Sequence, residues 1–146
     1  MTQSNHKTTL TIFMEEIWNS GDFSRCAELV FDSYEVKHDP GDPWEGQTLD
    51  LATFQQRVMY SRNAFPDLRF DIQEMIQEGD KVVASWVMSG THLGDLPDLP
   101  ATQRQFAIPG MTIYYFCNEK VGGHHQSFDR LGFLGQMGFF EQVMDG

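Results

Sequence analysis

The change in hydrophobic periodicity halfway along the chain constrains its fold most strongly. In the first half, apolar residues recur every three or four positions, which is the spacing of amphipathic helices. The clearest of these stripes comprises Leu10, Phe13, Met14, Ile17 and Trp18. From Leu68 to Asp129, apolar and polar residues alternate instead, which is the spacing of strands with one buried face. Helices that precede a sheet along the chain predict an α+β domain.

The first half predicts three helices separated by turn residues. The first helix carries the stripe and ends at Gly21, since glycine readily adopts the left-handed conformation of a helix C-terminus. The second would bury Phe23, Cys26, Ala27 and Val30. Residues Tyr34–Asp39 then form a short strand or extended arm. Thr48 can cap the third helix, which ends before Pro66. Its inner face would comprise Leu51, Phe54, Val58 and Phe65.

The second half predicts a meander of four antiparallel strands and a last short helix. The strands cover residues 68–76, 81–92, 104–117 and 120–129. Gly79 supplies the hairpin turn between the first two, and Pro109-Gly110 predicts a bulge or bend in the third. The last helix covers Leu131–Met137. A bent sheet of this kind, wrapped around helices, would enclose a cone with an apolar interior.

Length, charge and cysteine content limit the partners and the compartment. The 146 residues suit one domain, spanning 1–146 with residues 1–7 as a flexible tail. A net charge of -11 argues against nucleic acid and anionic membranes as partners. Two distant cysteines do not suggest a disulfide scaffold, and no apolar run suggests a signal or membrane span. These features predict a cytoplasmic protein.

Motifs for metal and cofactor binding are missing from the sequence. It contains no His-Glu-x-x-His, His-x-His or Cys-x-x-Cys spacing and no glycine-rich phosphate loop. It also has no Gly-x-Ser-x-Gly nucleophile motif. We therefore expect neither a metal nor a cofactor.

Six short motifs, in order along the chain, resemble a known family. They are Glu16-x-Trp18-Asn19-x-Gly21-Asp22, His38-Asp39-Pro40, Asn63-Ala64-Phe65-Pro66-Asp67-Leu68, Glu78-Gly79-Asp80-Lys81-Val82, Gly90-Thr91-His92-Leu93-Gly94, and Phe128-Asp129-Arg130-Leu131-Gly132 with Gln136-Met137-Gly138. Together they resemble the SnoaL-like polyketide cyclases over residues 8–139. The resemblance implies the nuclear transport factor 2-like fold, in which three N-terminal helices pack on a curved, mostly antiparallel sheet of four to six strands. It also implies ring closure of polyketides by an intramolecular aldol reaction without metal or cofactor.

The resemblance places the catalytic aspartate of that family at Asp129. If Asp129 faces inward, strand alternation puts His125 on the same face, where it could pair with the carboxylate. His38 and His92 could hydrogen-bond a substrate oxygen. Each residue also has a structural interpretation: Asp129 as the N-cap of the last helix, and the histidines as partners of nearby polar groups.

Aromatic and apolar residues at strand spacing could line the cavity of the cone. The candidates are Trp44, Phe65, Trp86, Met88, Met111, Ile113, Tyr115 and Phe128. The alternative is that they form an ordinary core. Tyr115, Gly123 and His125 depart from the residues usual in the family, as does Ala101-Thr102-Gln103. These departures suggest a different substrate or a different reaction.

The sequence thus favours a cofactor-independent cyclase or isomerase acting on a small hydrophobic molecule. Two other functions stay open. The cone could bind a ligand without catalysis, or the outer sheet face could form a homodimer. Val83 and Val87, apolar residues expected on that outer face, are the signal for a dimer.

Overall fold

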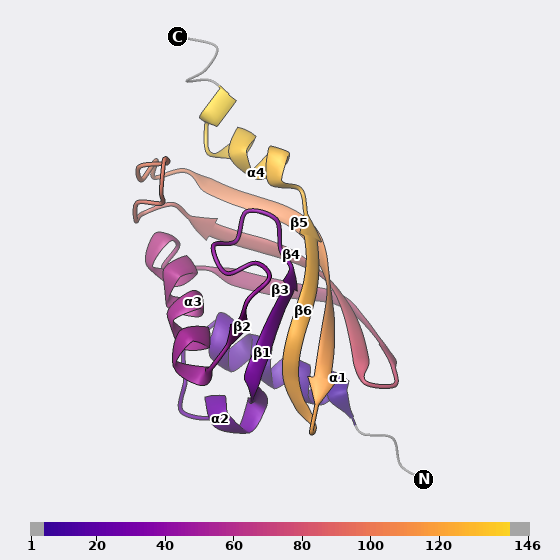
Figure 1. Cartoon of the computed structure of the whole chain (residues 1–146). Coiled ribbons are helices and arrows are strands. Elements are labelled where there is room, and N and C mark those ends of the chain that lie inside the picture. Colours follow the sequence, from indigo (N-terminus) through magenta and orange to yellow (C-terminus); the bar gives the residue numbers. More distant parts are fainter. Residues whose placement is uncertain (1–4, 141–146) are drawn as a thin grey trace.

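A computed structural model describes residues 5–140 of the chain as an α+β domain (Figure 1). The helical elements are α1 (His6–Phe13), the π-helical turn η1 (Met14–Trp18), α2 (Cys26–Leu29), α3 (Leu51–Ala64) and α4 (Arg130–Gln136). The strands are β1 (Val30–His38), β2 (Thr48–Leu49), β3 (Arg69–Glu78), β4 (Lys81–Thr91), β5 (Gln105–Cys117) and β6 (Lys120–Phe128). None of the described helices is long and apolar enough to cross a membrane.

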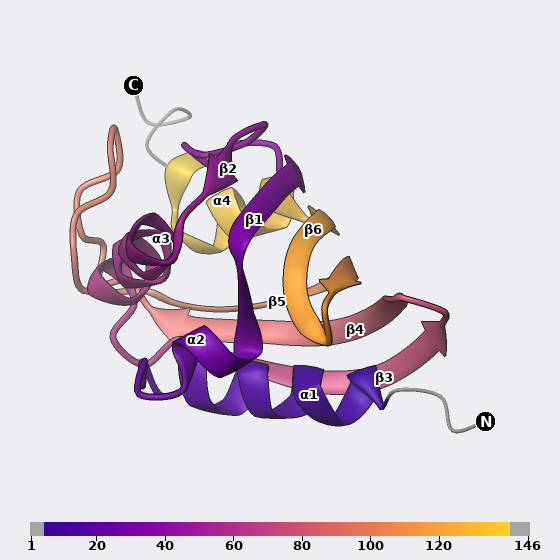
Figure 2. The same cartoon turned by 60° about the horizontal axis from the view of Figure 1, so that its bottom comes forward.

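One six-stranded sheet, in the order β2-β1-β6-β5-β4-β3, forms the frame of the domain. The predicted meander is confirmed in β3 to β6, whose neighbours all pair antiparallel. β1 adds to this meander parallel to β6, and β2 pairs antiparallel with β1. Figure 2 shows that the sheet bends strongly, so that β6 and β1 rise away from the plane of β3, β4 and β5. α1 contacts β3, β4 and β6, whereas α3 contacts β1 and β2.

The predicted stripe of the first helix is the centre of the core. Its five residues, Leu10, Phe13, Met14, Ile17 and Trp18, are all buried. They meet Phe54 and Val58 of α3 and the inward-facing residues of β4, among them Val82, Ala84 and Trp86. Each large apolar side chain buried in this way contributes about 1.5–3 kcal/mol to stability.

Three local predictions in the first half were wrong in detail. The second helix is a single turn, because Val30 already begins β1. α3 is capped by Asp50, whose Oδ1 accepts from the backbone N–H of Thr53 at 2.8 Å; Thr48 lies in β2 instead. Residues 6 and 7 of the predicted tail belong to α1, while residues 1–4 lie outside the described part of the chain.

The predicted bulge at Pro109-Gly110 is also absent, because the register between β4 and β5 runs without a shift along both strands. Gly110 serves a packing purpose. It pairs with Trp86, and a Cβ atom at Gly110 would lie 2.3 Å from the nearest atom of the Trp86 indole ring. The glycine therefore lets the ring lie directly on the backbone of β5.

A bulge that the sequence did not predict lies near the end of β1. There the register with β6 shifts between the pairs Val36–His124 and His38–His125. Lys37 and His38 are consequently both exposed, and Asp39 turns inward and is buried. Bulges commonly re-aim side chains next to functional sites.

Candidate functional site

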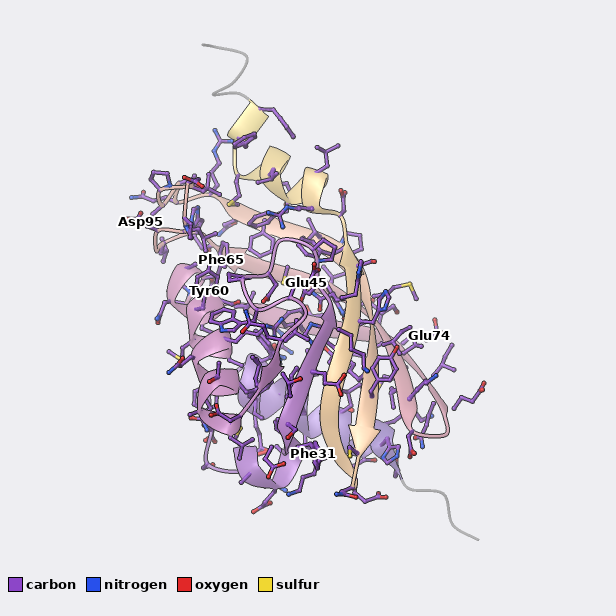
Figure 3. The ribbon with its side chains drawn as sticks, viewed as in Figure 1. Phe31, Glu45, Tyr60, Phe65, Glu74 and Asp95 are labelled. Carbon is purple, nitrogen blue, oxygen red and sulfur yellow. The ribbon has the colours of Figure 1, made fainter. Side chains whose placement is uncertain are left out.

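A cavity of about 570 Å³ opens between the concave side of the sheet, α3 and α4. Its volume is typical of small-molecule sites. Figure 3 shows Tyr60 and Phe65 at the end of α3 that faces the loop carrying Asp95. The wall is mainly aromatic and aliphatic. Its apolar residues include Trp18, Phe65, Leu68, Phe70, Met88, Leu96, Leu99, Phe106, Phe128, Phe133 and Leu134.

A charged cluster interrupts this apolar wall where β1, α3 and β6 meet. Arg57 of α3 donates from Nη2 to Asp39 Oδ2 at 2.9 Å and from Nε to Asp42 Oδ2 at 3.0 Å. His124 of β6 places Nε2 2.8 Å from the same Asp39 oxygen. The side chains of Asp39 and Arg57 are only 5% and 6% exposed, so both charges are almost completely removed from bulk water.

Two atoms of the cluster stay without a hydrogen-bond partner in the described part of the chain. Across residues 5–140, neither Asp39 Oδ1 nor Arg57 Nη1 has a hydrogen-bond partner. They are not sealed within the protein, since His92 Nε2 is the one fully covered and unpaired side-chain atom in that range. Asp39 and Arg57 both line the cavity. A carboxylate and a guanidinium, joined through Nη2 and Oδ2, thus belong to a mainly apolar wall.

The cluster carries a net negative charge. Burial lowers the pKa of His124, and its hydrogen bond to Asp39 only partly opposes this; the charge of Arg57 lowers the pKa further. His124 is therefore neutral at pH 7. One guanidinium then faces the two carboxylates of Asp39 and Asp42. A carboxylate at the wall of a cavity is a group of the kind that acts as a general base.

Comparison with known proteins identifies the family. A sequence profile of the SnoaL-like polyketide cyclases matches residues 8–137. This chain belongs to the SnoaL-like polyketide cyclase family. A candidate polyketide cyclase from Acidithiobacillus ferrooxidans is 43% identical to it; the alignment covers 94% of this chain and 97% of that one, with a TM-score of 0.84. No curated protein sequence matches the chain significantly.

More distant solved structures share the fold. TsrD from Streptomyces laurentii is 22% identical over 94% of this chain and 98% of its own, with a TM-score of 0.78. IdmH from Streptomyces antibioticus, a candidate polyketide cyclase, is 24% identical over 92% of this chain and 99% of its own, with a TM-score of 0.77. The predicted family and the predicted α+β, nuclear transport factor 2-like fold are therefore confirmed, and the family supports a cyclase or isomerase role.

Asp129, the aspartate suggested by the resemblance, lies outside this cluster. It is exposed and caps α4, with its Oδ1 accepting from the backbone N–H of Gly132 at 2.8 Å. Its neighbours Phe128 and Arg130 line the cavity, whereas Asp129 does not. The structure thus shows the capping interaction, and a catalytic role of Asp129 stays a prediction.

The predicted histidines are not brought together at the cavity. His38 and His125 are exposed on the outer face of the sheet, where their ring centroids lie 4.5 Å apart. Their expected inward placement is wrong, because the β1 bulge turns His38 outward and β6 points His124 inward in place of His125. His92 is buried against Phe65 and Thr102 without lining the cavity.

The eight predicted wall residues divide between the two sides of the sheet. Phe65, Met88 and Phe128 line the cavity. Trp86 lies in the core, and Trp44 packs on Tyr60. Met111, Ile113 and Tyr115 lie on the outer face, where Met111 borders a shallow apolar hollow. A homodimer through this outer face stays a prediction.

The sequence did not identify Asp39, Asp42 or Arg57 as site residues, although it contained a signal for Arg57. This arginine lies between Phe54 and Val58 on the buried face of a helix. An arginine on such a face is rarely buried without a partner. The partner carboxylates could not be located without the β1 bulge.

Two of the buried histidines, His92 and His124, make stability depend on pH. Burial lowers the pKa of both His124 and His92. In the unfolded chain both rings take up protons near pH 6.5, whereas in the folded protein they do so only at lower pH. Stability is therefore fully present above pH 6.5 and falls on acidification, because the unfolded chain takes up protons that the folded protein binds only at lower pH.

Urea unfolding between pH 7.5 and 5.5 measures this dependence above the range in which carboxylates titrate. His124→Gln should reduce the slope, and His125→Gln, at an exposed position, should leave it unchanged. A wild-type stability that is constant between these pH values would contradict the expectation.

Proposed function

We propose that this protein is a cofactor-independent cyclase or isomerase that moves a proton on an apolar, polyketide-like carbonyl compound held in the cavity. The observation that carries the proposal is the buried Asp39–Arg57 pair, which lines a cavity whose wall is mainly aromatic and aliphatic. Asp39 is the general base, and Arg57 stabilises the negative charge that develops on the substrate oxygen.

The reaction begins at a carbon next to a substrate carbonyl group. Asp39 Oδ1 takes the proton from this carbon, and the electron pair of the C–H bond moves onto the carbonyl oxygen, giving an enolate. Arg57 Nη1 donates to that oxygen. A preorganised donor of this kind is worth about 2.7–4 kcal/mol.

Asp39 can return the proton to the substrate in two ways, which give different products. In a cyclisation, the enolate carbon attacks a second carbonyl of the same molecule, a C–C bond forms, and Asp39 gives its proton to the new alkoxide. In an isomerisation, Asp39 gives the proton to a different carbon. Both outcomes balance without an oxidant, reductant or metal. The aromatic wall supplies the binding energy, since it excludes water and matches a flat apolar substrate.

The proposal can be tested with 2-tetralone, a bicyclic aromatic ketone with an acidic C–H next to its carbonyl. The protein should accelerate deuterium exchange of this ketone in D₂O, followed by ¹H NMR. Met88→Trp, which fills the cavity, should abolish the acceleration. Met111→Trp, on the outer face of the sheet, is the matched control and should retain it. Both variants require a native circular dichroism spectrum.

Binding of 2-tetralone without exchange would contradict the enzyme and favour a carrier that uses the same cavity. Equal loss of exchange in both tryptophan variants would show that the cavity is not the reaction site.

A further inference from the structure

We propose that Tyr34 is a positioning residue that fixes the tautomer of His124 and thereby leaves one oxygen of Asp39 free to act as the base. This inference rests on the proposed function for its kinetic consequence, whereas the tautomer itself is a property of the resting protein. The hydroxyl of Tyr34 lies 2.6 Å from His124 Nδ1, on the side of the ring opposite to Asp39.

The hydrogen-bond partners of His124 determine where its proton lies. An ionised carboxylate can only accept, so the 2.8 Å contact to Asp39 places the hydrogen on Nε2; Arg57 Nη2, which can only donate, lies farther from this nitrogen, at 3.4 Å. A neutral imidazole then has a lone pair on Nδ1, and Tyr34 donates its hydroxyl hydrogen to it. The two hydrogen bonds thus run in one direction: Tyr34 donates to His124, and His124 donates to Asp39.

Burial and packing fix the position of the Tyr34 side chain. It is 1% exposed, and its ring packs against Phe54 at a centroid distance of 4.8 Å. Burial raises the pKa of its hydroxyl well above the usual value, so the group keeps its hydrogen across the working pH range. Tyr34 lies in β1, and Asp39 directly follows the last residue of that strand, so one short segment supplies both ends of the chain of hydrogen bonds.

The two carboxylate oxygens of Asp39 therefore have different roles. Oδ2 accepts from His124 and from Arg57, which fixes the plane of the carboxylate. Oδ1, which has no hydrogen-bond partner within residues 5–140, is then available to a molecule in the cavity that Asp39 lines. Without the Tyr34 hydroxyl, the Nδ1 lone pair would be buried with no donor and the ring would lose its fixed orientation. The base would be misaligned, and misalignment of about 1 Å can cost up to a hundredfold in rate.

The deciding measurement is the ¹⁵N NMR spectrum of protein labelled at histidine. His124 should show a protonated Nε2 and an unprotonated Nδ1 that accepts a hydrogen bond. In Tyr34→Phe, the Nδ1 resonance should move downfield because the donor is lost. Tyr114→Phe is the matched control: this tyrosine is also buried, but its hydroxyl donates to Met14 Sδ at 3.5 Å. It should leave the resonance unchanged.

Kinetics of 2-tetralone exchange supply the second readout. Tyr34→Phe should lower kcat by about ten- to a hundredfold with KM unchanged, and Tyr114→Phe should alter neither. A hydrogen on Nδ1 in the wild-type protein would overturn the inference, as would a Tyr34→Phe variant with unchanged resonance and kcat. The wild-type spectrum decides the tautomer even if the variant does not fold. If Asp39→Asn keeps its exchange activity, the proposed function fails, but the tautomer is still decided by the spectrum.

Discussion

Asp39→Asn is expected to lower the rate of 2-tetralone exchange by about 10²–10⁴-fold, the usual contribution of a general base. The amide has nearly the shape of the carboxylate and can still accept from Arg57 and His124 through its oxygen. It cannot take a proton from carbon. We therefore expect binding of the ketone to be retained and the exchange, measured by ¹H NMR, to be lost.

Asp129→Asn is the matched control for this result, because it makes the same chemical change at the aspartate suggested by the family resemblance. The amide retains an oxygen that can cap α4, so we expect near-native stability and unchanged exchange. The reverse pattern, an inactive Asp129 variant and an active Asp39 variant, would move the acid–base chemistry to Asp129. It would require the Asp129 side chain to leave its position as a helix cap.

Arg57→Met is expected to lower the free energy of unfolding by about 3–5 kcal/mol at pH 7. Methionine replaces the volume of the stem but leaves the carboxylates of Asp39 and Asp42 facing each other with no cation between them. These side chains are only 5% and 16% exposed, so water cannot replace the lost partner. Urea unfolding followed by circular dichroism measures the change.

Arg69→Met provides the comparison for that stability loss. Arg69 also contacts two carboxylates, those of Glu15 and Asp71, but all three side chains are more than half exposed. Surface ion pairs of this kind contribute at most about 1 kcal/mol. Equal losses in the two arginine variants would show that the Asp39–Arg57–Asp42 cluster is not energetically distinct from a surface pair.

The sequence predicted the main elements of the fold because periodicity reports burial directly. The stripe from Leu10 to Trp18 and the alternation in β3 to β6 each follow one buried face over many residues. Short elements were harder. α2 is one turn long and β2 has two residues, so neither is long enough to show a period.

The site was harder to predict than the fold because a single bulge changes which residues face inward. With regular alternation, Tyr34, Val36 and His38 would share a face and Asp39 would point outward. The extra residue in β1 reverses this after Val36, so that Asp39 enters the cavity and His38 leaves it. A one-residue shift of this kind changes the face of every side chain that follows. Strand spacing alone could not have revealed it.

The interior position of His124 could not be derived from the sequence either. His124 and His125 are adjacent, so alternation places them on opposite faces but does not say which one faces inward. The pairing of β6 with both β1 and β5 decides this, and it depends on contacts far apart in the sequence.

The crystal structure of a complex with 2-naphthol, a stable mimic of the enolate of 2-tetralone, tests the central claim most directly. The account predicts that the ring system lies in the cavity between Phe65 and Met88, with its oxygen within hydrogen-bond distance of Arg57 Nη1 and next to Asp39 Oδ1. A naphthol bound with its oxygen at Asp129, or in the hollow on the outer face of the sheet, would contradict it.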